Sequence, residues 1–239
     1  MIADRRVLAV VPARGGSKGI KLKNLRTIAG RPLVALAGDV ARAVPEIDRR
    51  VVSTDHAEIA RVAREAGLDA PFMRPEAISG DRIADWDVLN HALHATEALD
   101  GVRYDIIAML QPTSPLREPA HVSGAIRMLV DGGWDSVWSV SATDSKGHPL
   151  KQLTITDGAL EYWDPRGAQI IARQQLTPVY HRNGIVYAIT RECLVEQRSI
   201  KGRRNGAFVI EGEHISIDTE WDIALVEFFL ARQAAARSA

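Results

Sequence analysis

The sequence predicts an α/β fold with a mostly parallel, Rossmann-like sheet and helices on both faces. Short apolar runs alternate with longer segments in which apolar residues recur at helical spacing. A glycine-rich, basic loop follows the first apolar run directly. Strands that alternate with helices are joined by crossover connections, which place the strands parallel in one sheet.

The predicted elements follow one another in regular order. Apolar runs of strand length predict strands at 7–11, 50–53, 104–110, 136–140 and 184–189. Helical periodicity predicts helices at 32–44, 57–66, 85–98, 119–130 and 220–231. Pro32 suits the first turn of its helix, and Gly67 suits the end of the second.

The alternation is interrupted after Ser141. Residues 148–178 contain two short β-like pieces, "LKQLTI" and "GALEYW", and then a polar stretch, "RQQL". These pieces do not form another strand–helix–strand unit. We therefore predict a single domain over residues 1–239 with an inserted arm at about 145–180.

The composition excludes several classes of protein. The chain has 239 residues, of which 46% are hydrophobic, and its 30 basic and 30 acidic residues cancel. A neutral chain lacks the broad positive surface of a nucleic-acid binder. No apolar run reaches the roughly 18 residues that a membrane span needs. We read 7–11 as a core strand and not as a signal peptide, and we expect a cytoplasmic protein without membrane contact.

The single cysteine excludes two further kinds of site. Cys193 is the one cysteine of the chain, so it can form neither an intrachain disulfide nor a cysteine-rich metal site. We expect it to be a small side chain of the core.

The loop from Pro12 to Asn24 is the first candidate site. Basic residues outnumber acidic ones eight to one between residues 1 and 31. Ligands of open α/β sheets bind beyond the carboxyl ends of the strands, where this loop is expected to lie. Glycine N–H groups and cationic side chains together suit a polyphosphate. The spacing matches neither the P-loop nor the dinucleotide fingerprint.

Motifs along nearly the whole chain resemble those of one family. They are "VPARGGSKGIKLKN", "VVSTD", "MRPEAISGD", "LQPTSPLR", "HPLK", "RQQL", "NGIVY" and "IDTEWD", in this order. By these motifs the chain resembles the acylneuraminate cytidylyltransferases, the enzymes that make CMP-sialic acid and its relatives.

The resemblance implies a reaction. The anomeric hydroxyl of a nonulosonic acid of the sialic, legionaminic or pseudaminic acid type attacks the α-phosphorus of CTP, and pyrophosphate leaves. Mg²⁺ is the implied cofactor, because pyrophosphate release normally requires it. Two alternatives stay open: a cytidylyltransferase for another sugar acid such as Kdo, and a family member without turnover that binds CTP or the sugar acid as a sensor.

The resemblance also assigns roles to residues. Arg14, Lys23 and Asp218 are the implied catalytic residues. The implied nucleotide-binding residues are Arg14, Gly15, Gly16, Ser17, Lys18, Lys23, Asn24 and Arg74. The implied sugar-binding residues are Gln111, Lys151, Arg173 and Asn183.

The arm is similar to the family's dimerisation segment, which reaches over the active site of the partner. This likeness predicts a homodimer in which Lys151 and Arg173 contact a substrate across the dimer. Dimer or tetramer is left open.

Two positions depart from the family pattern. The family presents two aspartates as D-x-D before the final helix, but here Ser216 replaces the first and Asp218 fills the second. The metal is therefore expected on Asp218. His181 stands where the family often has arginine, and the neighbouring Arg182 is a candidate substitute.

Several polar residues have two possible roles at this stage. Asp85 and Asp87 are predicted to be the N-cap and a first-turn acid of a helix, although a metal site is an alternative. Ser114 suits either the site or the cap of a helix after Pro115. Arg117 suits a structural or a binding role, and His148 suits either loop ordering or catalysis.

Overall fold

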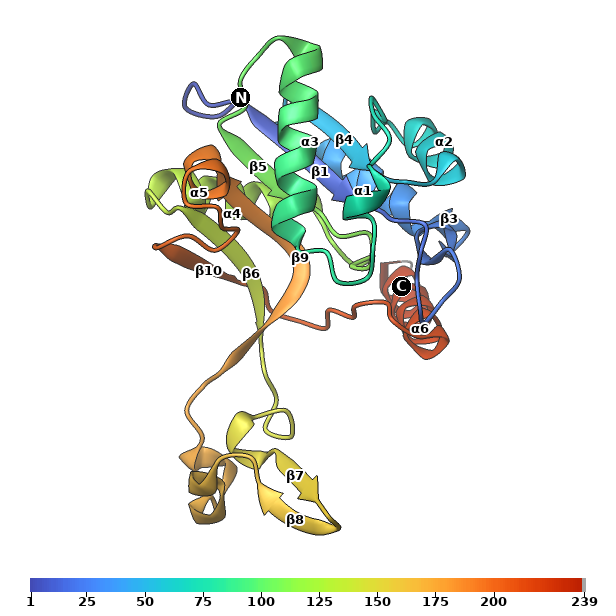
Figure 1. Ribbon diagram of the computed structural model, residues 1–239. Helices are drawn as coiled ribbons and strands as arrows, with labels where there is room; N and C mark the ends of the chain where they lie inside the picture. The colour runs from blue at the N-terminus through green and yellow to red at the C-terminus, as the bar shows by residue number, and fades with distance from the viewer. Residues whose placement is uncertain (238–239) are drawn as a thin grey trace.

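The computed structural model describes residues 1–237 and contains an α/β core from which an arm projects (Figure 1). The core is built on a six-stranded sheet with the order β10-β6-β9-β5-β1-β4. These strands are β1 (Val7–Pro12), β4 (Arg49–Ser53), β5 (Ile106–Met109), β6 (Ser136–Ala142), β9 (Tyr180–Thr190) and β10 (Asn205–Val209).

The sheet is mostly parallel, so the predicted fold class is confirmed. β1 pairs in parallel with β4 and β5, and β10 pairs in parallel with β6. β9 is the exception, because it runs antiparallel to both β5 and β6. The reason is the arm: β6 leads out of the core into the arm and β9 returns directly from it, without a crossover helix.

Helices cover both faces of the sheet. They are α1 (Leu33–Ala43), α2 (Ala57–Glu65), α3 (Asp85–Asp100), α4 (Pro119–Asp131) and α5 (Arg191–Val195). A further helix, α6 (Glu220–Arg237), packs in a separate apolar cluster with Ile28 and with Leu33 of α1. Alternate residues of β1 enter different apolar clusters: Val7 packs with residues of α1, α2 and α4, and Leu8 packs with residues of α3 and α5. Burial on both faces explains why the first strand is continuously apolar.

The observed boundaries lie within a few residues of the predicted ones, apart from α6, which continues to Arg237. The prediction missed α5 and β10, as well as the small hairpin of β2 (Thr27–Ile28) and β3 (Arg31–Pro32). Short 3₁₀ helices add η1 (Lys23–Leu25), η2 (Glu76–Ile78), η3 (Pro149–Lys151), η4 (Pro165–Gln169) and η5 (Arg173–Gln175).

The arm stands away from the core, below the sheet in Figure 1. Its two β-like pieces form an antiparallel hairpin of β7 (Leu153–Thr156) and β8 (Ala159–Tyr162). Asp157 and Gly158 make the turn, both with positive φ, which is the backbone that a tight Asp-Gly hairpin requires.

Cys193 lies in the core, as its sequence context predicts. Its side chain is fully buried and its Sγ donates to the carbonyl of Ser199 at 3.1 Å. Burial raises the pKa of the thiol to about 12, so the group is protonated and unreactive at neutral pH. In the described part of the chain, no helix has the length and apolar character of a membrane span.

Two leucines of α3 test the account of the core. Leu93 is fully buried against the sheet, whereas Leu99 is 61% exposed on the same helix. Leu93→Ala should lower the free energy of unfolding by about 2–5 kcal/mol, because it leaves a cavity. The matched change Leu99→Ala should stay within about 0.5 kcal/mol. Urea unfolding measures both, and equal losses would contradict this packing.

Candidate active site

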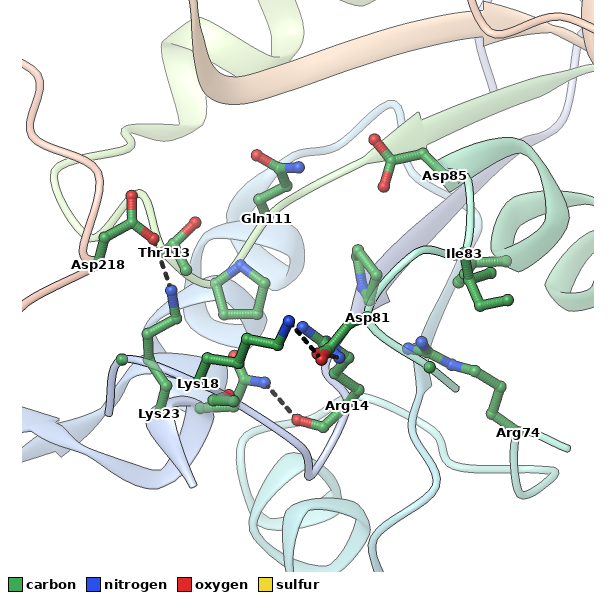
Figure 2. A pocket seen from close by; sticks show the side chains of 17 residues that line it. Arg14, Lys18, Lys23, Arg74, Asp81, Ile83, Asp85, Gln111, Thr113 and Asp218 are labelled. Carbon is green, nitrogen blue, oxygen red and sulfur yellow. Dashed lines mark hydrogen bonds and ion pairs between the residues drawn. The ribbon is translucent and has the colours of Figure 1, made fainter. Parts of the chain in front are cut away.

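A cavity of about 520 Å³ lies beyond the carboxyl ends of β1 and β5. Its walls come from four parts of the chain: the loop 12–24 after β1, the segment 74–88, the turn after β5, and a strap of residues 211–219 that joins β10 to α6. Figure 2 shows the labelled side chains converging from these segments. The structure therefore places a cavity where the sheet topology predicts a ligand.

Asp81 organises the cationic end of this cavity. Its carboxylate accepts from Arg14 Nη1 and forms an ion pair with Lys18 Nζ at 2.9 Å (Figure 2). Hydrogen bonds from Lys18 and Arg14 lower the pKa of the Asp81 carboxyl, so it is ionised at neutral pH. Two of the predicted nucleotide-binding cations thus share one acidic partner that an incoming anion can replace.

Lys23 joins the loop to the strap. Its Nζ donates to the carbonyl of Ile217 and to Oδ1 of Asp218, both at 2.8 Å. Gly19 makes the closest approach, because a Cβ there would lie 2.5 Å from the backbone oxygen of Asp218. A glycine at this point is therefore a packing requirement of the site.

The remaining loop residues divide into two groups. Ser17 and Lys18 line the cavity, whereas Gly15 and Gly16 are not part of its lining. The Gly15 N–H donates to Oδ1 of Asp55 at 2.7 Å and so helps to fix the loop to β4's end. Asn24 lines the cavity but is buried, and its Nδ2 donates to the carbonyl of Arg14 at 2.9 Å.

Arg74 forms a buried part of the cavity wall. Its guanidinium donates to Oγ of Ser53 at 3.1 Å and to the Ser53 carbonyl. Burial lowers the pKa of Arg74 to about 10, which still leaves the group charged at neutral pH. Its position is therefore fixed before any ligand arrives.

Gln111 lines the cavity from the turn after β5. Arg117 holds that turn in place. The buried Arg117 guanidinium donates to the carbonyls of Gln111, Gly184 and Ile185. Burial lowers the pKa of Arg117 to about 9. The structure thus gives Arg117 a structural role.

Ser114 does not cap a helix. α4 begins at Pro119 with Glu118 as its N-cap, and the Ser114 hydroxyl donates to the carbonyl of Asn183 at 3.2 Å. The turn between β5 and α4 is longer than the sequence signal suggested, so the hydroxyl ties the turn to β9 instead.

A second, polar cavity of about 190 Å³ adjoins the first. Arg182, Asn183 and Tyr187 of β9 and Ser216 of the strap contribute to its lining. The amide of Asn183 is committed internally: Oδ1 accepts from Ser139 Oγ at 2.6 Å, and Nδ2 donates to Ser141 Oγ at 3.0 Å. The polar side chains that remain for a ligand in this cavity include Arg182 and Ser216.

The prediction that Asp85 is the N-cap of α3 is wrong. The N-cap of α3 is Ala84, and Asp85 is the first helical residue. Its side chain makes no capping hydrogen bond, and it lines both cavities. Asp87 lies in the first turn, as predicted. An acid is favoured anywhere in a first turn, so the sequence does not separate a capping acid from one that faces a site.

Lys151 and Arg173 lie outside both cavities of this chain. They belong to η3 and η5 of the arm and are exposed. His148, at the start of η3, orders the arm: its Nδ1 accepts from the N–H of Leu150, and its Nε2 lies 3.1 Å from the Thr177 carbonyl.

The donor set limits which metal can bind. Within residues 1–237, no three His, Cys, Asp or Glu side chains are grouped as a metal site. Asp218 lines the larger cavity with its side chain 73% exposed, whereas Ser216 lines the smaller one. The Asp218 carboxylate fits Mg²⁺, which binds proteins through one or two carboxylates together with substrate phosphates and water.

The fold and the two adjoining cavities fit a nucleotide-binding transferase. Cations at one end of the larger cavity suit a polyphosphate, and the adjoining polar cavity has room for a second, smaller reactant. The profile of the cytidylyltransferase family matches residues 8–227. The chain belongs to this family of CTP-dependent nucleotidyltransferases.

Three individual proteins with similar sequences have names that state what they make or modify. The chain is 32% identical to the CMP-N,N'-diacetyllegionaminic acid synthase of Legionella pneumophila, over 93% of this chain and 95% of that protein. It is 28% identical to the post-translational flagellin modification protein B of Campylobacter coli, over 94% of each chain. It is 26% identical to the N-acylneuraminate cytidylyltransferase of Escherichia coli, over 92% of this chain but about half (51%) of that longer protein.

A solved structure confirms the fold. The chain superposes on a CMP:2-keto-3-deoxy-manno-octonic acid synthetase complexed with CTP with a TM-score of 0.71, covering 95% of this chain and 99% of the other. The two sequences are 20% identical, so this likeness supports the fold and not the choice of substrate.

The packing of Gly19 predicts a loss of CTP binding. Gly19→Ala should weaken CTP affinity about tenfold or more, equivalent to about 1.4 kcal/mol, because the loop and the strap must separate. Gly16→Ala is the matched control, since a Cβ there meets only Arg14 Nη1, at 4.0 Å. Calorimetric titration with CTP measures both variants. A weaker effect at Gly19 than at Gly16 would contradict the observed contact.

Proposed function

We propose that the protein transfers CMP from CTP to the anomeric hydroxyl of a nonulosonic acid and releases pyrophosphate. The observation that carries this proposal is the pair of adjoining cavities, one with a cationic end and one that Arg182 lines. The names of the relatives, which include legionaminic acid and N-acylneuraminate enzymes, support the class of sugar acid.

The larger cavity suits CTP. Arg14, Lys18 and Lys23 would surround the triphosphate, and the buried Arg74 lies on another wall, where it suits the cytidine. Nucleotidyl transfer depends mainly on positioning and on neutralising charge around phosphorus. The triphosphate would take over Arg14 and Lys18 from Asp81.

The smaller cavity suits the sugar acid. The Arg182 guanidinium lies 5.3 Å from the centre of the Trp138 ring, a stacking contact that directs the group without neutralising it. A guanidinium in this setting binds a carboxylate well. His181 is engaged differently, because its Nδ1 lies 3.0 Å from Thr143 Oγ1. Arg182 is therefore our candidate for the sugar carboxylate.

Mg²⁺ fits the site as a cofactor held by Asp218, phosphate oxygens and water. When bound, it would supply a Lewis acid that neutralises charge on the departing pyrophosphate. Lys23 already holds the Asp218 carboxylate toward the cavity. Ser216 offers a hydroxyl in place of a second carboxylate, which leaves the site with fewer negative charges.

The arm supports a homodimer. Cross-strand partners share one face of a hairpin, and here they pair Leu153 with Tyr162 and Ile155 with Leu160. All four side chains are exposed, as are Trp163 and Ile171 beyond the hairpin. An exposed apolar face of this kind is typical of an interaction surface. In such a dimer Lys151 and Arg173 would reach the cavities of the partner. We place the enzyme in the cytoplasm, where CTP is available.

Pyrophosphate release tests the function. The assay uses CTP and Mg²⁺ with sialic, legionaminic and pseudaminic acids and with Kdo, and we expect release with a nonulosonic acid. Arg14→Ala should lower turnover about 100- to 1,000-fold, because it removes a charge-assisted contact to the phosphates. Lys21→Ala removes a loop charge that does not line the cavity and should leave turnover nearly unchanged.

The same assay separates the alternatives. Release with Kdo alone would reassign the enzyme to another sugar acid. Calorimetric CTP binding without release from any acceptor would indicate a sensor, and the Ser216 position would then be the first to change. Undiminished turnover in Arg14→Ala would refute the phosphate role of the loop.

A charge on the arm tests the dimer. Ile155→Asp should convert the dimer to monomers, because it buries a carboxylate in the apolar face, and should also lower activity. Thr156→Asp places the same charge on the opposite face of β7, across from Ala159, and should leave the dimer intact. Sedimentation equilibrium reports both. A wild-type protein that sediments as a monomer would refute the dimer.

A further inference from the structure

The two cavities share a small part of their walls. Of the residues that the structure places around them, Asp85 and Gln111 border both. Figure 2 shows Asp85 beside Gln111, on the side of the larger cavity away from Asp218. If a donor occupies one cavity and an acceptor the other, the reacting atoms must meet where the cavities join, and these two residues lie there.

The carboxylate of Asp85 is unpaired among the described residues and can therefore interact with a ligand. Within residues 1–237 the Asp85 carboxylate makes no hydrogen bond or ion pair, whereas Asp81 pairs with Arg14 and Lys18, and Asp218 pairs with Lys23. The charged and titratable groups that face it are Arg74 from the segment before η2, and Arg182 and Tyr187 from β9. Its neighbour Asp87 lines a separate surface hollow with Trp86 and His91.

Burial supplies a second property. It raises the pKa of the Asp85 carboxyl above its ordinary value, against the lowering influence of Arg182 and Arg74. A carboxylate that is more basic than usual accepts a proton more readily. Titratable groups whose pKa is shifted and which lie in a cleft are often functional.

We propose that Asp85 is the general base that accepts the proton of the attacking sugar hydroxyl. This inference rests on the proposed function. The hydroxyl oxygen forms a bond to the α-phosphorus of CTP, the bond from that phosphorus to the bridging oxygen breaks, and pyrophosphate departs with its electron pair. The hydroxyl proton passes to the Asp85 carboxylate and from there to solvent.

Other acids near the cavities are less suited to this role. Asp81 and Asp218 line the larger cavity but not the smaller one, so neither lies where the two cavities join. Gln111 shares the junction, but an amide cannot take up the proton and serves instead to orient the hydroxyl. Asp85 is the carboxylate at the junction that is not already paired.

The test is the pH profile of Asp85→Asn. In the wild-type enzyme kcat/KM should fall as the pH drops below the pKa of Asp85, because the protonated acid cannot act as a base. Asp85→Asn should lower kcat about 100- to 1,000-fold, lose this acidic limb, and retain the wild-type CTP affinity by calorimetry. Asp85→Ala should regain activity when formate is added, because formate can replace the missing carboxylate.

Asp87→Asn is the matched control, since it removes an acid of the same helical turn that faces away from both cavities. It should keep both kcat and the pH profile. Thermal unfolding shows whether each variant is folded, and formate rescue would show that Asp85→Ala retains a working site.

The outcomes distinguish a failure of the general-base role of Asp85 from a failure of the proposed transferase activity. Asp85→Asn with near-normal kcat and an unchanged acidic limb would refute the base while the transferase activity stands. A variant that gains activity with UTP relative to CTP would also refute it, because Asp85 would then read the nucleobase. Absence of pyrophosphate release from the wild-type protein would refute the proposed function and the base with it.

Discussion

The site depends on how one cationic loop is held in place. Arg14, Lys18 and Lys23 lie within ten residues of one another, and like charges so close together repel. Asp81 and Asp218 balance them from two other segments, so the same ion pairs that neutralise the loop also bring the segment 74–88 and the strap to it. These pairs are partly open to solvent and contribute little to stability. Their importance is that a triphosphate can replace them.

Buried contacts supply the rigidity that exposed ion pairs cannot. Arg117 ties the turn after β5 to the middle of β9, and the Asn183 amide ties β9 to the hydroxyls of β6. Gly184, with φ at +70°, lets β9 approach Gln111 so closely that a Cβ would lie 2.5 Å from its Oε1. The backbone where the two cavities meet is therefore fixed by the buried Arg117 guanidinium and the carbonyls that it binds. Gln111 belongs to this fixed backbone and borders both cavities.

Much of this arrangement could be predicted from the sequence, because local patterns encode local structure. The continuous apolar run of β1, the basic loop after it and the two β-like pieces of the arm are each predicted from such local patterns. Asp85 shows where such reasoning stops: its place at a helix start looks the same whether it caps the helix or faces a cavity. The direction of β9 and the internal partners of Asn183 depend on contacts between distant segments, which no local pattern contains.

The central claim is that the loop after β1 binds the triphosphate of the nucleotide. Calorimetric titration with CTP, CDP and CMP at two salt concentrations tests it most directly. We expect affinity to fall as each phosphate is removed, and the affinity for CTP to weaken most at high salt because its charge is screened. Equal affinities for CTP and CMP, with no dependence on salt, would contradict the account.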